Sequence, residues 1–208
     1  MKRVGLLGGS FNPAHEGHRQ MSLAAMDALG LDELWWLVSP GNPLKESADM
    51  APYEARIASA REMAEGTPIR VSDFEHRAGT RYTIDTIRLL LAEDSRDRFI
   101  WLMGADTVAQ FHRWKDWRDL AQLLPIAVLP RPGYDEPAHA ARAMGWLSRF
   151  VRPESQAKQW TEWSLPAILF LRLPTSPASA TALRASDPNW HRRSAERDNN
   201  PSDDGSPT

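Results

Sequence analysis

The 208-residue sequence contains no cysteine, no long hydrophobic run and almost no excess charge. Without cysteine the chain has neither a disulfide framework nor a catalytic thiol. No apolar run reaches the length of a membrane span, and Met1-Lys2-Arg3 leads into a short strand-like run and not into the core of a signal peptide. We therefore expect a cytoplasmic protein with no membrane partner.

The charge balance also restricts the class of partner. The formal net charge is -2 and the calculated pI is about 6.3, so no overall positive potential attracts nucleic acid. Hydrophobic residues make up 42% of the chain and charged residues 25%, which is typical of a globular protein. We expect one folded domain and no nucleic-acid partner.

Short apolar runs alternate with helical segments along most of the chain. The predicted strands cover residues 4–7, 34–38, 69–71, 99–103, 126–129 and 168–173, and the clearest helices cover 20–29, 52–65 and 84–92. Gly30 is a predicted C-terminal cap and Thr83 a predicted N-cap. The alternation predicts βαβ units in a Rossmann-like, doubly wound α/β fold, with a mostly parallel sheet and helices on both faces.

The composition changes near residue 186. Residues 187–208 are rich in Asp, Asn, Ser, Pro and Arg, and Trp190 is their only large apolar side chain. Such a segment buries too little surface to offset the entropy lost on ordering. The sequence predicts a folded domain over 1–186 and a disordered tail over 187–208.

The segment between the first predicted strand and helix is suited to binding an anion. Gly8 and Gly9 allow close approach to the backbone, and the following helix N-terminus favours negative charge. His15 and His18 lie three residues apart, on one side of the first helical turn. A Gly-Gly turn alone is usually only a turn, and the histidine pair could be half of a zinc site or two surface histidines, although without cysteine a zinc site would need an unusual set of ligands.

A second candidate anion site follows the last predicted strand. Ser179 and Thr181 supply hydroxyl groups at a predicted helix start, and Arg184 lies one turn further on. The alternative is an ordinary helix cap with a surface arginine.

Taken together, the two segments resemble nucleotidyltransferases of the His-x-Gly-His superfamily, and within it the bacterial nicotinate-nucleotide adenylyltransferases. The C-terminal signature of the superfamily is Ser-Ser/Thr-Thr-x-x-Arg, and Ala180 departs from it at the second position. Family members usually continue into a further helix with a Tyr-Ile and Gly-Leu-Tyr pattern, which residues 187–208 lack, so any role of that helix in a possible homo-oligomer is open. The shared motifs are Gly9-Ser10-Phe11-Asn12-Pro13, Asn42-Pro43-Leu44-Lys45, Tyr82-Thr83-Ile84-Asp85-Thr86, Gly104-Ala105-Asp106, Trp114 with Trp117, and Arg131-Pro132-Gly133-Tyr134.

The resemblance implies transfer of AMP from ATP to nicotinate mononucleotide, with Mg²⁺ accompanying ATP and no metal held by the protein itself. It implies that His15, His18 and Arg184 are catalytic, and that Asp106 bonds the ribose, although Asp106 could also cap a helix. The ATP site implied by the resemblance comprises Gly8, Gly9, Ser10, Phe11, His15, His18, Gly104, Asp106, Ser179, Thr181 and Arg184.

For the acceptor, the resemblance implies contacts with Asn42, Lys45, Thr83, Trp114 and Arg131. Asn42, Lys45 and Arg131 could instead be ordinary loop residues, and Trp114 could be a core anchor. The alternatives for the whole protein are an adenylyltransferase acting on nicotinamide mononucleotide or phosphopantetheine, and a non-catalytic nucleotide-binding protein of the same fold.

Overall fold

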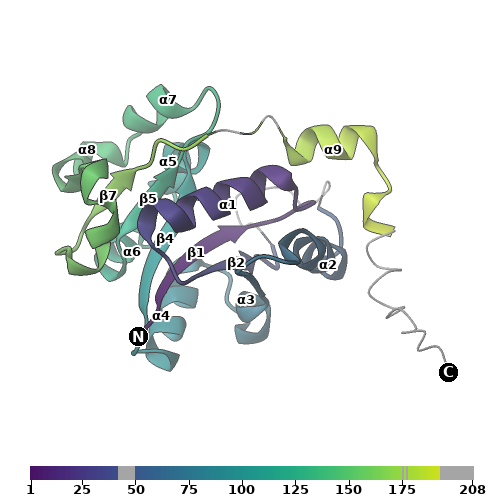
Figure 1. Cartoon of the computed structure of the whole chain (residues 1–208), viewed down its shortest axis with the longest axis horizontal. Coiled ribbons are helices and arrows are strands. Elements are labelled where there is room, and N and C mark those ends of the chain that lie inside the picture. The colour runs from purple at the N-terminus through teal and green to yellow at the C-terminus, as the bar shows by residue number, and fades with distance from the viewer. Residues whose placement is uncertain (42–49, 175, 177, 193–208) are drawn as a thin grey trace.

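The computed structural model of the chain is a three-layered α/β domain (Figure 1), and it describes residues 1–41, 50–174, 176 and 178–192. Its sheet has seven strands in the order β3-β2-β1-β4-β5-β7-β6, and every pair of neighbours is parallel. The strands are β1 Arg3–Gly9, β2 Glu33–Val38, β3 Ile69–Ser72, β4 Arg98–Gly104, β5 Ile126–Leu129, β6 Val151–Arg152 and β7 Ile168–Phe170. The predicted Rossmann-like fold class is confirmed.

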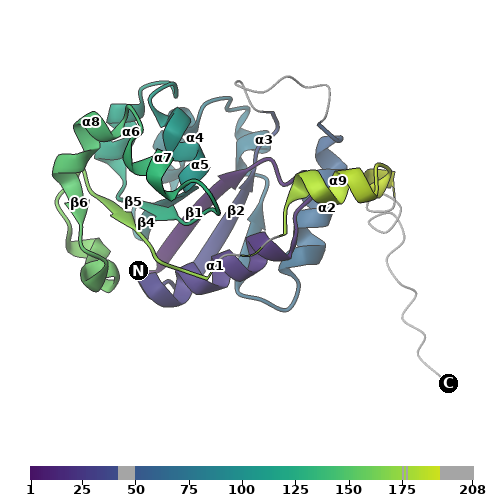
Figure 2. The ribbon, with the colours of Figure 1, turned by 90° about the horizontal axis from the view of Figure 1, so that it is seen from above.

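Helices cover both faces of this sheet (Figure 2). They are α1 Glu16–Leu29, α2 Tyr53–Ala64, α3 Phe74–Ala78, α4 Thr83–Glu93, α5 Ala105–Phe111, α6 Trp117–Leu123, α7 Asp135–His139, α8 Met144–Leu147 and α9 Ala180–Ser186, with 3₁₀ helices at Ser148–Phe150 and Glu154–Glu162. None of the helices in the described ranges is long and apolar enough to span a membrane.

Two hydrophobic cores follow from the alternation of side chains along the strands. In β4, Phe99 and Trp101 point into the core shared with α4, α5 and α6, while Ile100 and Leu102 point into the core shared with α1 and α2. A strand buried on both faces needs a continuous apolar run, as in β4. This explains why the strands were visible in the sequence as unbroken apolar runs.

The sheet order creates a switch point beside β1. The chain runs from β1 to β2 and β3 on one side, and returns to β4 and β5 on the other. The helices that follow β1 and β4 therefore diverge, and they leave a crevice beyond the carboxyl ends of these two strands. Any ligand site of this fold is expected there.

Individual caps and boundaries show where sequence patterns succeed and fail. Gly30 caps α1 in the left-handed conformation, with φ 61° and ψ 48°, as predicted. Thr83 is not an N-cap: α4 begins at Thr83, its N-cap is Tyr82, and no side chain caps the helix. The predicted strand over 168–173 ends at Phe170, and β6 was not predicted because two residues carry no periodicity.

The domain boundary at residue 186 stays a prediction, with one observation that bears on it. Residues 187–192 lie within the described part of the chain, and Trp190 is only 7% exposed. The amide of Trp190 donates to the carbonyl oxygen of Asp187. An isolated aromatic residue gives no sequence pattern from which its burial could have been predicted.

Helix α2 carries a buried cation that holds two loops together. Arg56 is 1% exposed, and its guanidinium donates to the carbonyl oxygens of Ser10 at 2.7 Å, Ser39 at 2.7 Å, Pro40 at 3.1 Å and Ala51 at 3.0 Å. Ser10 follows β1 and Ser39 follows β2. Arg56 thus sets the spacing of the two loops at the edge of the crevice.

We expect Arg56→Met to lower the free energy of unfolding by about 3 kcal/mol, because four partly buried bonds from the buried guanidinium to loop carbonyl oxygens are lost. The melting temperature should fall by roughly 6–12 °C in differential scanning calorimetry. Arg61→Met, at an exposed position on the same helix, is the matched control and should cost less than about 1 kcal/mol. Equal losses in the two variants would show that the carbonyl cluster does not need this guanidinium.

Candidate active site

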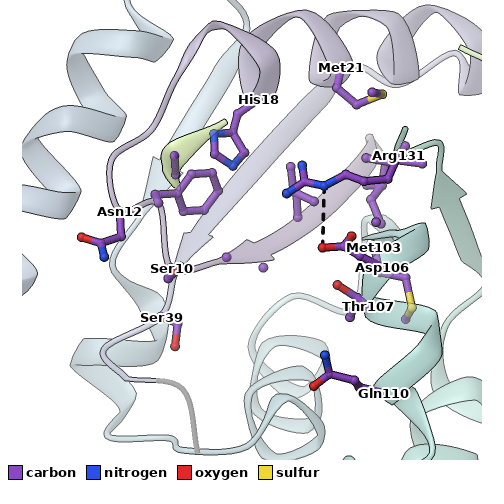
Figure 3. Close-up of a pocket in the computed structure, with 18 of the residues that line it drawn as sticks. Ser10, Asn12, His18, Met21, Ser39, Met103, Asp106, Thr107, Gln110 and Arg131 are labelled. Carbon is purple, nitrogen blue, oxygen red and sulfur yellow. Dashed lines mark ion pairs between the residues drawn. The ribbon is translucent and has the colours of Figure 1, made fainter. Parts of the chain in front are cut away.

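A pocket of about 460 Å³ lies beyond the carboxyl ends of β1, β4 and β5 (Figure 3). This volume is within the usual range for a small-molecule site. All the sequence-predicted site residues that the structure describes line this pocket. Asn42 and Lys45 lie outside the described residues.

The turn after β1 forms one wall. A Cβ atom on Gly8 would lie 2.7 Å from the ring of Trp101, so only glycine fits between β1 and β4 here. Phe11 has φ 46°, an unusual conformation for a large side chain. Its ring stacks on Trp36 with 4.9 Å between centroids and lies 5.1 Å from the ring of His18. Phe11 therefore packs against the ring of His18 and also lines the pocket.

The two histidines of the turn are held by α1. His15 is the N-cap of α1, and its backbone N–H donates to Nδ1 of His18 at 3.2 Å. Because Nδ1 of His18 accepts this bond, a neutral His18 carries its proton on Nε2. The two rings lie 3.8 Å apart between centroids. The predicted grouping of both imidazoles at the first turn of the helix is what the structure has.

Burial keeps both histidines uncharged. Desolvation, followed by the charge of Arg131, lowers the pKa of His15 to about 4. Desolvation lowers the pKa of His18 to about 3, with smaller contributions from His15 and Arg131. At neutral pH both rings are therefore neutral donors in the unliganded protein, and an anion placed beside them would raise both pKa values.

Gly17 brings the C-terminal segment next to these rings. A Cβ atom at Gly17 would lie 3.0 Å from the His15 ring and 3.3 Å from the carbonyl oxygen of Ala178. The absence of a side chain at Gly17 thus lets the segment before α9 lie close to His15. The position of Gly17 in the sequence motif does not predict this contact.

Helix α9, near the C-terminal end of the chain, forms another wall of the pocket. Ser179 caps α9 by accepting from the amide of Ala182 at 3.1 Å, so the helix-cap alternative for this serine is correct. Arg184 is half-buried, and its guanidinium donates to the carbonyl oxygen of Asn12 at 2.6 Å and to the Thr181 hydroxyl at 3.4 Å. The two candidate anion sites are therefore parts of one pocket.

Asp106 and Arg131 face each other across the pocket. Figure 3 shows their ion pair, with 3.6 Å between Asp106 Oδ2 and Arg131 Nε. Asp106 lies in the first turn of α5, which has Gly104 as its N-cap and no side-chain cap, so Asp106 does not cap this helix. A Cβ atom at Gly104 would lie 2.4 Å from Asp106 Oδ1. The charge of Arg131 acts on both histidines, which puts this arginine near the histidine turn as well.

Another end of the pocket is formed by α4 and the segment after α5. Trp114 is partly buried, lies edge-on to Trp101 and Phe111, and still lines the pocket, so core packing and a ligand contact are compatible. Lys115 pairs with Asp85 at 2.9 Å and lies 5.0 Å from the ring centre of Tyr82. Thr83 opens α4 beside them.

Sequence reasoning missed several residues of the pocket wall. Glu75, Thr107 and Gln110 line it. Thr107 directly follows Asp106, and Gln110 follows Asp106 by four residues and Thr107 by three, so extending that motif along α5 could have found both. Among the described residues no group of three His, Cys, Asp or Glu could hold a metal ion.

Comparison with known proteins finds one matching family model and relatives that share a name. Residues 6–186 match the cytidylyltransferase-like family. The probable nicotinate-nucleotide adenylyltransferase of Erythrobacter litoralis is 54% identical over 191 residues, covering 92% of this chain and 87% of that protein. That of Gluconobacter oxydans is 50% identical over 184 residues, covering 88% and 94%.

Solved structures share the fold at low sequence identity. The Plasmodium falciparum nicotinic acid mononucleotide adenylyltransferase complexed with NaAD is similar with a TM-score of 0.65 and 14% identity, covering 94% of each chain. The same protein complexed with APC gives a TM-score of 0.64 at 14% identity, covering 89% of this chain and 83% of that one.

Proposed function

This chain belongs to the cytidylyltransferase-like family, and from that premise we propose that it transfers AMP from ATP to nicotinate mononucleotide, forming nicotinate adenine dinucleotide in NAD biosynthesis. The observation that carries the residue assignment is the bond from Arg184 to the carbonyl oxygen of Asn12. It joins the histidine turn and the C-terminal hydroxyl segment in one pocket, where the phosphates of a single nucleotide can contact both.

The reaction is an in-line displacement at phosphorus. An oxygen of the acceptor 5′-phosphate forms a bond to the α-phosphorus of ATP, and the bond from that phosphorus to the bridging oxygen of the β-phosphate breaks. Pyrophosphate leaves with the electron pair. No protein side chain needs to be covalently modified, so catalysis rests on positioning the reactants and on stabilising charge as it develops.

The histidine turn would bind the α-phosphate side of ATP. In its neutral tautomer His18 presents Nε2–H as a donor, and its Nδ1 is already occupied by the backbone of His15. Such a donor strengthens as negative charge grows on the phosphate oxygens, and its pKa rises at the same time. His15 would contact the same phosphates from the helix N-terminus, beside Gly8 and Gly9, which line the pocket.

The C-terminal segment would hold the leaving pyrophosphate. Thr181 offers a hydroxyl group and Arg184 a planar fork of donors, which suits phosphate oxygens. Ser179 contributes through its place at the start of α9. Mg²⁺ would enter with ATP, held mainly by phosphate oxygens and water, since this ion binds few protein ligands in such sites.

Asp106 would accept hydrogen bonds from the ribose of ATP. In the unliganded pocket this carboxylate faces Arg131 at 3.6 Å, and ribose hydroxyls can share or replace that contact. Arg131 is then available to a phosphate near the histidines. Gly104 leaves the space that Asp106 needs.

The acceptor would bind at the α4 end of the pocket. The first amides of a helix lack partners one turn before them, and although the amide of Asp85 donates to the carbonyl oxygen of Tyr82, the start of α4 and its dipole favour a carboxylate beside Thr83. Trp114 would support the pyridine ring. Asn42 and Lys45 would face the acceptor phosphate, by the family resemblance alone.

We expect kcat/KM to favour nicotinate mononucleotide over nicotinamide mononucleotide by at least about tenfold. An amide group presents an N–H to the helix amides and leaves buried donors unpaired, at a cost of about 1–3 kcal/mol. Steady-state release of pyrophosphate from ATP, measured with each acceptor and with phosphopantetheine, tests this directly.

Trp114→Ala should weaken both acceptors and reduce the preference, while Trp117→Ala, outside the pocket wall, is the control for loss of an indole. Equal rates with the two mononucleotides would contradict the proposed acceptor. An absence of pyrophosphate release with every acceptor would instead favour the non-catalytic alternative.

A further inference from the structure

The proposed mechanism leaves one buried acid of the pocket without a role. Glu75 is in α3, is 8% exposed and lines the pocket. A buried carboxyl group normally has a cation or several donors as partners. The sequence does not predict that Glu75 is buried, because three of its four nearest neighbours, Asp73, His76 and Arg77, are polar or charged.

The side chain of Glu75 contacts the first turn of α4. Oε1 of Glu75 lies 3.5 Å from the hydroxyl of Thr86, which lies 2.8 Å from the Thr80 hydroxyl and 3.3 Å from the carbonyl oxygen of Tyr82. Thr86 follows Thr83 by three residues, so the two are neighbours on one face of the helix. Glu75 therefore lies beside the helix end where the acceptor carboxylate would bind.

No cation compensates this carboxyl group within the described part of the chain. Helix α3 packs against β2 and α4, and its His76 also stacks on Tyr53 of α2. The buried cation of α2, Arg56, is bonded to four loop carbonyl oxygens. Charged groups of β2 and α4 have partners of their own. Glu33 of β2 pairs with Lys2. On α4, Asp85 pairs with Lys115, and Arg88 pairs with Asp119. The cations nearest to Glu75 in the sequence also contact other groups. Arg77 pairs with Asp73, and the ring of His76 stacks on Tyr53. In the connection from α3 to α4, Arg81 lies over the ring of Tyr82. Thr86 is the partner that faces Glu75.

Burial without a facing cation favours an uncharged Glu75. The Thr86 hydroxyl has one proton, and it faces the Glu75 carboxyl, the Tyr82 carbonyl and the Thr80 hydroxyl. A protonated Glu75 can donate to the Thr86 hydroxyl, whose own proton then goes to the Tyr82 carbonyl oxygen, an oxygen that also accepts from the amides of Asp85 and Thr86. Burial raises the pKa of Glu75 to about 7, and the Thr86 hydroxyl offsets this only partly.

We propose that Glu75 is a positioning residue for the acceptor: through Thr86 it holds the first turn of α4 against the acceptor end of the pocket, and it does so as the neutral acid. Ionised Glu75 places a second negative charge beside the acceptor carboxylate and removes the donor from Thr86. Both effects weaken acceptor binding and leave the ATP end of the pocket unchanged. The inference rests on the proposed function, because it assigns the acceptor to this end.

The sign of the pH dependence follows from the charge. Below about pH 6 Glu75 is protonated and acceptor binding is at its strongest, and as the pH rises through about 7 the acid ionises and the acceptor KM increases. Bound acceptor, being negative, raises the pKa of Glu75 further. The acceptor phosphate also titrates in this range, so the effect of Glu75 is the difference between the wild type and a variant that cannot ionise.

The test measures KM for each substrate from about pH 6 to about pH 9 in the wild type, Glu75→Gln and the control Glu93→Gln, an exposed acid at the far end of α4. We expect the acceptor KM of the wild type and of Glu93→Gln to rise by about fivefold or more beyond the rise seen in Glu75→Gln. The ATP KM should agree within about twofold in all three. Thermal melts confirm that each variant is folded.

A second pair of variants tests the route through Thr86. Thr86→Val removes the hydroxyl group at nearly constant volume and should raise the acceptor KM by about fivefold or more, whereas Thr86→Ser should restore it to within about twofold of the wild type. An equally steep pH dependence in Glu75→Gln and the wild type, or an equal rise in both KM values in Thr86→Val, would overturn the proposal. A wild-type enzyme that forms no dinucleotide would count against the proposed function itself.

Discussion

His18→Ala should lower kcat by more than about a hundredfold while the protein keeps its fold. The substitution removes the Nε2–H donor that we propose contacts the phosphates, and such a donor contributes most when charge develops in the transition state. It also frees the backbone N–H of His15, but that amide is at a helix N-terminus, where water or a ligand can accept its bond. Single-turnover and steady-state formation of nicotinate adenine dinucleotide measure the effect.

The control for His18→Ala is His191→Ala, which removes an imidazole from a position outside the pocket wall. His191→Ala should leave kcat within about twofold of the wild type. His18→Gln offers an amide donor in place of Nε2–H and should recover only part of the rate, because the longer side chain is not fixed by the amide of His15. A His18→Ala enzyme with nearly normal kcat would refute the assignment of transition-state stabilisation to this residue.

Arg184→Ala should lower kcat/KM for ATP by about a hundredfold or more, because the pyrophosphate loses its bidentate cation. Arg184 also joins α9 to the turn after β1 through the carbonyl oxygen of Asn12, so the ATP affinity should fall together with kcat. Calorimetric titration with ATP in the absence of acceptor separates the two contributions.

Arg184→Lys tests whether the fork or the charge matters. A lysine keeps the charge but cannot span the Asn12 carbonyl and the Thr181 hydroxyl with one planar group, so we expect partial recovery, about tenfold below the wild type. Arg192→Ala removes an exposed arginine from the same end of the chain and should be neutral. Equal activity of Arg184→Ala and Arg192→Ala would mean that the C-terminal segment does not hold the leaving group.

The sheet could be predicted largely from the sequence because a parallel strand buried on both faces is a continuous apolar run. The runs at 4–7, 99–103 and 126–129 each became a strand, with shifts of only one or two residues at the ends. Strand β6 and helix α3 could not be predicted, since two and five residues are too short for any periodicity. Their positions depend on contacts with elements that are distant in the sequence.

The glycine and histidine turn was visible for a different reason: its residues are functional groups at fixed local spacing. Glu75 and Arg56 lack such a signal. Each is a charged residue in an otherwise ordinary helix, and each is buried only because the loops after β1 and β2, or the first turn of α4, fold over it. Thr83 was misread as a cap because the choice between Tyr82 and Thr83 depends on one residue of backbone geometry.

The bond between Arg184 and Asn12 also has a consequence for the order in which the protein assembles. It joins residues 172 positions apart, and β1 must pair with β4, which is some ninety residues later in the chain. Contacts of such long sequence separation form late and slowly, since a large loop must close first. On the ribosome β1 and β2 can associate early, but the nucleotide site has both its walls only after α9 has been synthesised. While the sheet is forming during synthesis, ATP therefore cannot bind to the turn after β1 and to α9 together. Its binding then contributes less to the stability of the incomplete chain than to that of the finished protein.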